Sequence, residues 1–326
     1  MNSSYKGTLA LIGCGDWGKN IARTLSKLGA LACIVDSTDK AAAVAQELNV
    51  PLRSLTDILK NDSIKGAVIA TPTPTHVSIA EQVLSSGKHV FVEKPLAVHD
   101  HEISALQTLA DDKGLTLMVG HLLVYHQAFQ ALVSLVHSGK LGEVLSIETA
   151  RKNFGKIHAH EGVLWDLGPH DFSMILTLLQ RMPARILSQS LSYVYEGKPD
   201  IHTVLMQYEN GPQVLVGLSR LHPTKEQKVR VVGTKGTAVF DDTKDWSEKL
   251  VLYPHHLTPG ATTFSKEAAQ PVALSSAEPL KEEMLHFIDC CTTGKIPFSP
   301  ASQAQQVLSL INAVEMSDQK KEWVSL

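Results

Sequence analysis

Residues 9–18 read LALIGCGDWG, and this stretch decides the fold. A short apolar run, typical of a buried strand, leads into Gly13, Gly15 and Gly18, and a helical pattern follows over residues 19–27. The first glycine permits a tight turn, the second lets a pyrophosphate approach the backbone, and the third lets the helix pack on the strand. Strand, glycine turn and helix in this order predict a Rossmann unit whose helix N-terminus faces the phosphates of a dinucleotide.

The next apolar run, residues 31–35, ends on Asp36. Asp36 follows Gly15 by about 20 residues, the separation expected for the acidic residue that accepts hydrogen bonds from the adenosine ribose. The alternative is a turn aspartate after a strand. A carboxylate here repels a 2′-phosphate, so the expected cofactor is NAD. NADP stays open because the hydroxyl side chains of Ser37 and Thr38 tolerate a phosphate.

Composition bounds the class of protein. A chain of 326 residues is long enough for two domains and a large core. With 44% hydrophobic and 19% charged residues and a net charge of −3, it shows no bias toward nucleic acid or membranes. It has no signal-peptide pattern and no apolar run of membrane-spanning length. Its four cysteines have neither metal-ligand nor disulfide spacing. We therefore expect a cytoplasmic protein without a metal, nucleic-acid or membrane partner.

Two patterns of elements follow one another along the chain. Up to Gly120, apolar runs alternate with amphipathic segments, which predicts an α/β domain with a doubly wound parallel sheet over residues 1–121. Residues 122–326 predict an α+β domain with a large, mostly antiparallel open sheet, because strand-like runs follow one another and Asn210-Gly211 is a strong hairpin turn. The sequence leaves open whether a C-terminal helix packs back on the first domain. Strands are expected at residues 9–12, 31–35, 67–70, 90–92, 115–119, 144–150, 186–193, 203–208, 214–218, 229–232 and 237–240, and later helices at 125–138, 171–180, 279–293 and 302–317.

Two polar clusters follow predicted strands of the first domain. TPTPTH at residues 71–76 lies at the carboxyl edge of the sheet, where doubly wound folds bind ligands. Its alternative is a proline-stiffened turn with Thr75 as a helix cap. Glu93-Lys94-Pro95 ends the strand at residues 90–92, where a charged pair is costly unless it is paired or used. A partly desolvated Lys94 is a better proton donor or acceptor, and a plain surface pair is the alternative.

A third cluster, WDLGPHD at residues 165–171, combines a carboxylate with an imidazole. On one helical turn, Asp166 and His170 are neighbours on the same face, with Gly168 and Pro169 expected to set the helix start. A carboxylate orients an imidazole and raises its pKa, and such a pair is the usual apparatus for moving a hydroxyl proton. The alternative is a helix cap with a structural histidine.

The other histidines are weaker candidates. His158 and His160 lack further ligands at zinc spacing, and His255-His256 is expected in a solvated loop. His121, Tyr125 and His126 follow the last strand of the first domain, where we expect an interdomain cleft, with ordinary helix packing as the alternative.

The ordered set of motifs resembles the glucose-fructose oxidoreductase / inositol dehydrogenase / MocA family over nearly the whole chain. The set consists of the glycine motif at residues 13–18, Glu93-Lys94-Pro95, Gly120-His121 and Asp166 to His170. The resemblance implies an NAD(P)-dependent dehydrogenase that transfers a hydride between a nicotinamide cofactor and a secondary hydroxyl of a sugar. It also implies a homodimer or homotetramer formed through the C-terminal sheet.

The runs at residues 151–157 and 161–171 are most similar to family members that oxidise nucleotide sugars, the UDP-N-acetylglucosamine 3-dehydrogenase type. The basic residues Arg151, Lys152 and Lys156 suit a diphosphate, or lie solvated on an edge strand. The alternatives are an inositol, polyol or free-sugar dehydrogenase and, from another class, a non-catalytic NAD-binding regulator of the same fold.

The resemblance implies roles for individual residues. Lys94 is expected to touch the reacting hydroxyl or ketone, and Asp166 and His170 to form the acid/base pair. The expected cofactor-binding residues are Gly13, Gly15, Asp16, Trp17, Gly18, Asp36, Thr71, Pro72, Thr75, His76, Glu93, Lys94 and His121. The expected substrate-binding residues are Lys94, Tyr125, Arg151, Asn153, Trp165, Asp166 and His170. Cys14 is expected to pack in the core and Trp17 to cover the pyrophosphate.

Overall fold

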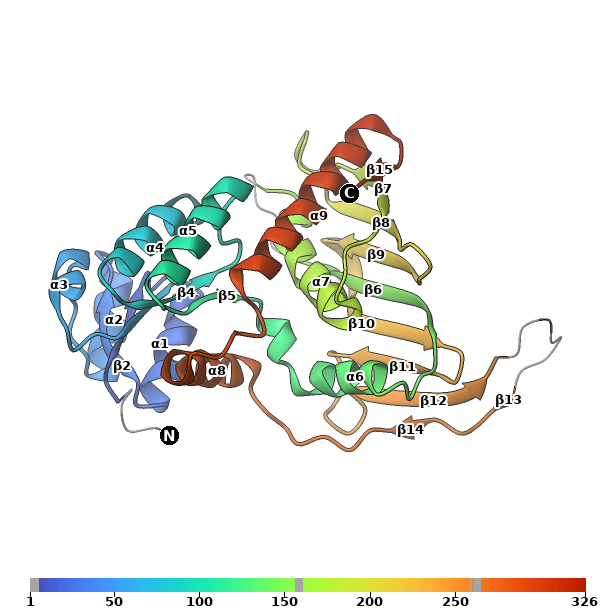
Figure 1. Ribbon diagram of the computed structural model, residues 1–326, viewed down its shortest axis with the longest axis horizontal. Coiled ribbons are helices and arrows are strands. Elements are labelled where there is room, and N and C mark those ends of the chain that lie inside the picture. Colours follow the sequence, from blue (N-terminus) through green and yellow to red (C-terminus); the bar gives the residue numbers. More distant parts are fainter. Residues whose placement is uncertain (1–5, 156–160, 258–259, 261–264) are drawn as a thin grey trace. The chain divides into compact units, whose positions relative to one another are not determined.

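The computed structural model describes residues 6–155, 161–257, 260 and 265–326 (Figure 1). Its contacts divide the chain into two units, Met1–Tyr125 with Glu278–Leu308, and His126–Ala277 with Ser309–Leu326. The division differs from the predicted break after residue 121, because the chain returns to the first unit near its end. Periodicity shows that a helix buries one face but not which core receives it, so this return is not readable from the sequence.

The first unit contains the predicted parallel sheet, in the order β2-β1-β3-β4-β5. After β1 the chain adds β2 on one side and β3 on the other, and this change of direction creates the crevice that binds ligands in doubly wound sheets. The strands are β1 Leu9–Ile12, β2 Leu31–Val35, β3 Gly66–Ile69, β4 His89–Glu93 and β5 Leu117–Gly120. All five predicted strands are confirmed, with ends within about two residues of the expected ones.

Helices surround this sheet and supply most of its core. They are α1 Gly18–Lys27, α2 Asp39–Leu48, α3 Leu55–Lys60, α4 His76–Ser85, α5 Asp100–Asp112 and α8 Pro279–Thr293, with short 3₁₀ turns η2 Thr73–Thr75 and η3 Leu122–Tyr125. Leu280, Met284 and Phe287 of α8 are buried in the same cluster as Leu9 of β1 and Ile21 of α1. Phe91 and Phe287 meet edge to face, with ring centroids 5.8 Å apart. This apolar face explains why α8 belongs to the first unit.

The second unit is built on a ten-stranded sheet in the order β13-β12-β11-β10-β6-β9-β8-β7-β15, with β14 paired to β12. Only β6 and β9 pair in parallel among these strands, which confirms the mostly antiparallel expectation. The strands are β6 Val144–Phe154, β7 Arg185–Leu191, β8 Ile201–Gln207, β9 Gln213–Ser219, β10 Leu221–Gly233, β11 Gly236–Asp241, β12 Leu250–His256, β13 Ser265–Lys266, β14 Gln270–Pro271 and β15 Val324–Ser325. Asn210 takes a left-handed conformation, with φ 46°, in the predicted β8–β9 hairpin.

The placement of His255-His256 in a solvated loop is wrong. Both residues lie on β12, and the His255 Nε2 atom is 2.9 Å from the Gly233 carbonyl oxygen. The internal Pro254 explains the error, because proline removes a ladder donor and is a signal against a strand. Here the β12 segment pairs with β11 regardless, with Pro254 opposite Gly236.

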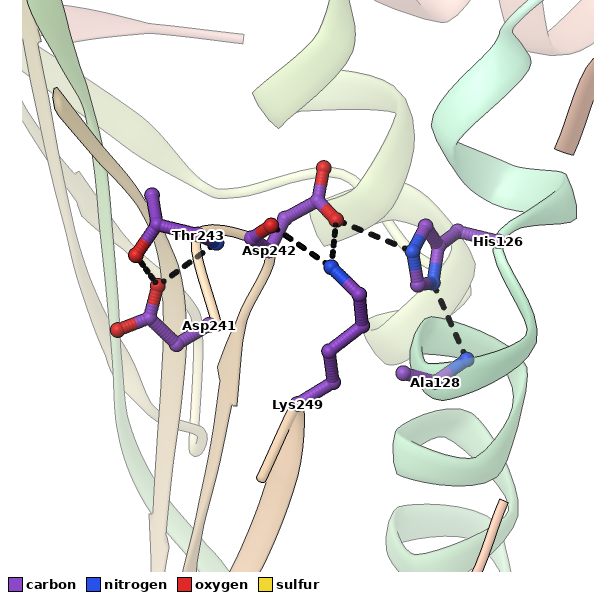
Figure 2. Close-up of polar contacts among 6 residues, drawn as sticks. All are labelled: His126, Ala128, Asp241, Asp242, Thr243 and Lys249. Carbon is purple, nitrogen blue, oxygen red and sulfur yellow. Dashed lines mark hydrogen bonds and ion pairs between the residues drawn. The ribbon is translucent and has the colours of Figure 1, made fainter. Parts of the chain in front are cut away.

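Two helices of this unit pack on the sheet, α6 Gln127–His137 against β11 and β12, and α7 Val163–Leu179 against β6, β8 and β9. The last helix, α9 Ala301–Lys320, begins in the first unit and ends in the second. His126 caps α6, because its Nδ1 accepts a hydrogen bond of 3.1 Å from the Ala128 N–H. Its Nε2 lies 3.1 Å from Asp242, which also binds Lys249 (Figure 2).

The expectation that Gly168 and Pro169 set the start of α7 is also wrong. The helix begins at Val163, and Pro169 lies inside it. Proline normally disfavours a helical residue before it, but Gly168 has no Cβ to clash with the proline ring. Among the described residues, no helix combines the length and apolar character needed to cross a lipid bilayer.

Candidate functional site

The glycine motif forms a turn that is closed by backbone contacts. Gly13 has φ +90°, and a Cβ built on it would lie 2.7 Å from the Ala70 carbonyl group. A Cβ on Gly18 would lie 2.3 Å from the Gly13 oxygen, whereas one on Gly15 meets nothing within 4 Å. Gly13 and Gly18 therefore allow the turn and the helix to approach each other. Gly15 leaves open space beside the backbone, as an approaching pyrophosphate requires.

Asp36 holds this turn from the end of β2. Its Oδ2 accepts a 2.7 Å hydrogen bond from the Cys14 N–H, and its Oδ1 accepts one of 2.8 Å from the Thr38 N–H. Burial raises the pKa of the Asp36 carboxyl, but these hydrogen bonds outweigh it and hold the pKa below its usual value. Each oxygen keeps a lone pair that a ribose hydroxyl can use. Cys14 is buried in the core, as expected.

The TPTPTH segment forms the loop between β3 and α4. His76 is buried, with its ring nitrogens 2.7 Å from the Thr71 carbonyl oxygen and 2.8 Å from that of Pro95. His76 thus joins the loops that follow β3 and β4. The Thr75 hydroxyl lies 2.7 Å from that of Thr71 and 2.8 Å from the Pro72 oxygen. These contacts order the loop. Contacts of Thr71, Pro72, Thr75 and His76 with the cofactor stay a prediction.

Glu93, the last residue of β4, contacts the glycine turn. The Trp17 indole N–H donates a 2.6 Å hydrogen bond to Glu93 Oε1. Glu93 is paired with Gly120 of β5, and a Cβ on Gly120 would lie 2.9 Å from Glu93 Oε2. Trp17 is 40% exposed, and the side chain of Asp16 is mostly exposed. Trp17 therefore ties the glycine turn to the start of the Glu-Lys-Pro segment, and its cover of a pyrophosphate stays a prediction.

Two aromatic candidates are buried in the first unit. Neither ring nitrogen of His121 has a hydrogen-bond partner in the described part of the chain, and burial, with the charge of Lys94, lowers its pKa to about 4. The Tyr125 hydroxyl lies 3.1 Å from Ser299 Oγ, and burial raises its pKa. His121 is therefore neutral at pH 7, and Tyr125 packs inside this unit. Neither placement tests a ligand contact.

In the second unit, Asp166 and His170 both lie on α7 and are half-buried. Four residues apart on one helix, they share a face, as the spacing predicts. A carboxylate and an imidazole on one face can take and return a hydroxyl proton. Lys94 belongs to the first unit.

Buried ion pairs hold the segment around α7. Arg151 Nε of β6 lies 2.5 Å from Asp171 Oδ2, and the Asp171 side chain is fully buried. Arg220 Nε lies 2.7 Å from Asp200, and its other nitrogens donate to the carbonyl oxygens of Glu161 and Lys198. Asp171 already neutralises the charge of Arg151, so a contact between Arg151 and a substrate diphosphate stays a prediction.

The remaining substrate candidates of the second unit lie near these pairs in the sequence. The Trp165 indole donates a 2.7 Å hydrogen bond to Glu315 of α9, and Asn153 is half-buried on β6. Lys156, Ile157, His158 and His160 lie outside the described residues. Sequence reasoning missed Asp171, although an acidic residue amid the apolar residues of a helix is a signal of a buried pair.

Residues 8–121 match the oxidoreductase family with an NAD-binding Rossmann fold, and residues 129–239 match the GFO/IDH/MocA C-terminal domain. The chain belongs to the GFO/IDH/MocA oxidoreductase family. It is 26% identical over 305 residues to UDP-N-acetylglucosamine 3-dehydrogenase of Acidithiobacillus ferrooxidans, which covers 92% of this chain and 93% of the relative. A solved structure of that enzyme superposes with a TM-score of 0.84 at 25% identity, covering 96% of this chain and 97% of that one.

Another relative in the family has a different named substrate. Inositol 2-dehydrogenase of Rhizobium meliloti is 25% identical over 268 residues, covering 78% of this chain and 81% of the relative. A solved structure of GenD2 from gentamicin A biosynthesis, in complex with NAD, shares the fold with a TM-score of 0.81 at 22% identity and covers 98% of this chain and 96% of that one. The two named dehydrogenases agree on the class of reaction and differ in the substrate.

The first unit of this GFO/IDH/MocA oxidoreductase fits its cofactor, NAD. The open side of Gly15 and the N-terminus of α1 suit a pyrophosphate, and the anchored carboxylate of Asp36 suits a ribose. These residues come from one turn and from the end of the adjacent strand. The chain is thus an NAD-binding oxidoreductase.

Proposed function

We propose that this protein is an NAD-dependent dehydrogenase that oxidises a secondary hydroxyl of a nucleotide sugar of the UDP-N-acetylglucosamine type. The observation that carries the proposal is the placement of Asp166 and His170 on one face of α7. The relative that oxidises UDP-N-acetylglucosamine matches across both units, from the glycine turn to the C-terminal sheet, which supports the same substrate class.

In this reaction NAD accepts a hydride from the sugar carbon. We assign His170 as the base that takes the hydroxyl proton, with Asp166 orienting the imidazole. Lys94 is assigned to hold the oxygen of the reacting hydroxyl as negative charge develops on it. For the nucleotide part, Asn153 of β6 is the half-buried polar candidate, since Arg151 is engaged by Asp171 and Lys152 by Glu226.

A turnover screen tests the substrate. Purified protein is mixed with NAD or NADP and with a panel of UDP-sugars, free sugars and inositols, and reduced cofactor is followed by absorbance. We expect reduction with a UDP-sugar and NAD, and stabilisation of the NAD complex by UDP-sugars in a thermal shift assay. Turnover of inositol without any response to UDP would favour the second candidate, an inositol or polyol dehydrogenase, which the Rhizobium meliloti relative supports.

A non-catalytic NAD-binding regulator is the alternative from another class. Against it, Lys94, Asp166 and His170 are all present, and a protein released from chemistry has no need of that set. Tight NAD binding without reduction of cofactor on any substrate of the panel would revive it.

We also propose that the protein forms a homo-oligomer through the open face of the second unit's sheet. Leu187, Leu205 and Leu215 are cross-strand neighbours on β7, β8 and β9, and Leu205 and Leu215 are each 37% exposed. Cross-strand apolar rows left in water favour association. Light scattering should give a dimer or tetramer, and replacement of Leu205 and Leu215 by Glu should give a monomer.

A further inference from the structure

A buried carboxyl group lies on α8 one turn before Phe287, whose ring meets that of Phe91 on β4, two residues before Glu93. Glu283 on α8 is fully buried, and neither of its oxygens has a hydrogen-bond partner in the described part of the chain. Its helix packs against α1 and η3. A negative charge on Glu93 raises the pKa of Glu283, and a negative charge on Glu283 raises the pKa of Tyr125. Burying a carboxyl group without a partner costs stability, and proteins accept such a cost mainly at functional sites.

Glu93 has a different environment from Glu283. It is half-buried, accepts the indole N–H of Trp17, and lies against Gly120, where any Cβ would clash with its Oε2. Lys94 follows it directly and places a positive charge beside it. Glu93 is therefore the member of the pair that can carry a negative charge at lower cost.

The two carboxyl groups cannot both ionise at neutral pH, because like charges in one apolar site repel each other. Burial and the charge of Glu93 raise the pKa of Glu283 well above its usual value. Burial also raises the pKa of Glu93, to about 7, although the Trp17 indole and Lys94 oppose this rise. The proton of the pair consequently stays on Glu283 when Glu93 ionises.

We propose that Glu283 is a positioning residue of the cofactor site, which remains a neutral carboxylic acid and solvates the ionised Glu93. As Glu93 loses its proton, the Glu283 O–H turns to donate to it. The Glu93 carboxylate then holds Trp17 of the glycine turn and the Lys94 ammonium in place for NAD. The inference rests on the dinucleotide site and not on the identity of the sugar.

Several elements around Glu93 and Glu283 carry polar or charged groups that act on these two carboxyl groups. Lys94 and Trp17 act on Glu93 from the end of β4 and from the glycine turn. Tyr125 of η3 interacts with Glu283, and the neutral His121 after β5 interacts with Lys94. Lys94 is the one cation that acts on Glu93 in this described set, so it opposes the rise in the Glu93 pKa in every variant below.

The first experiment titrates Glu93 through the fluorescence of Trp17, without sugar or cofactor. The difference between the wild-type signal and that of Trp17→Phe isolates this indole from the other tryptophans, and Glu93→Gln should remove the transition. We expect a midpoint near pH 7 in the wild type. Glu283→Gln, a neutral donor of the same shape, should keep it. Glu283→Met cannot donate and should raise the midpoint by about one unit.

The second experiment measures NAD affinity of the same variants by calorimetry at pH 7. Glu283→Gln should bind like the wild type, whereas Glu283→Met should bind roughly fivefold more weakly, as a one-unit rise in the Glu93 pKa requires. The melting temperature of the Met variant should stay close to that of the wild type, because the loss of one hydrogen bond is offset by the removal of a buried polar group. Glu282→Gln, at the next position of α8, is the matched control and should change neither quantity.

A Gln variant whose midpoint falls by one unit or more would place the negative charge on Glu283 and overturn the proposal. A Met variant with wild-type midpoint and affinity would also overturn it. If the Met variant lost stability and affinity together, Glu283 would be a structural residue of the core. None of these outcomes depends on the sugar, so failure here differs from failure of the turnover screen.

Discussion

The glycine turn of the first unit and helix α7 of the second are positioned in opposite ways. The turn depends on missing side chains, because Gly13 lets the Ala70 carbonyl group approach and Gly18 lets the helix approach the Gly13 oxygen. Helix α7 depends on added charge, because Arg151 reaches Asp171 from another strand and Glu315 reaches Trp165 from 150 residues away. The first arrangement is steric, and the second is electrostatic and works only after burial. Substitutions in the two units should therefore affect different properties of the protein.

The largest effect is expected on turnover. Lys94→Ala and His170→Ala should each lower kcat by about 10²–10⁴, because positioned acid/base groups contribute that much. NAD affinity, measured by calorimetry, should stay nearly intact. His256→Ala, an exposed histidine at the end of β12, is the control for the second unit. Unchanged turnover in either variant would remove the role assigned to that residue.

The next largest effect is expected on stability, at the buried ion pair between Arg151 of β6 and Asp171 of α7. Arg151→Ala should lower the free energy of unfolding by about 3–5 kcal/mol, since it leaves the fully buried Asp171 carboxylate without its cation. Urea denaturation measures this change. The double variant Arg151→Met with Asp171→Leu should recover most of the loss, because no charge then stays unpaired. A single variant as stable as the wild type would contradict the electrostatic account of α7.

In the glycine turn, the substituted position should decide whether stability or NAD affinity is lost. Gly18→Ala should cost about 1–3 kcal/mol of stability, because its Cβ would overlap the Gly13 oxygen. Gly15→Ala should leave the melting temperature unchanged, since nothing lies within 4 Å, yet weaken NAD binding by about tenfold, or ~1.4 kcal/mol. Unchanged NAD affinity in Gly15→Ala would show that the open space at Gly15 does not serve the cofactor.

An effect that appears only at low pH is expected at Asp242, which His126 and Lys249 bind (Figure 2). Burial opposes ionisation of Asp242, but hydrogen bonds from these two residues lower its pKa from 3.8 to about 2. Since the folded pKa is the lower one, the stabilisation is complete above pH 4 and is lost as the pH falls toward 2. It amounts to about 2 kcal/mol.

Urea denaturation at several pH values tests this. Asp242→Asn should flatten the change in stability between pH 4 and 2, whereas Asn at the exposed Asp245 should not. An unchanged slope in Asp242→Asn would mean that Asp242 does not supply the acid sensitivity. Unlike the glycine turn, this contact should respond to pH, because charge and not steric fit maintains it.

Much of the fold was predictable because its signals are local. The β1–α1 turn and the end of β2 at Asp36 follow from spacing and backbone preference within a few residues. The errors at Pro169 and Pro254 have a common form, because in both places a glycine accommodates the proline: Gly168 has no Cβ to clash with Pro169, and Gly236 lies opposite Pro254. Asp166 and His170 were predictable as neighbours because helix geometry fixes which residues share a face.

The sequence by itself determined the parallel sheet, the glycine turn, the carboxylate that follows β2 and the shared face of Asp166 and His170, because each depends on the chain's own short-range geometry. Only the tertiary structure decided that α8 belongs to the first unit, that Arg151 pairs with Asp171, and that Glu283 is buried without a hydrogen-bond partner in the described part of the chain. These facts depend on which distant groups share one apolar environment. Burial changes the energy of a charge more than any local pattern does, and burial exists only once the chain has folded.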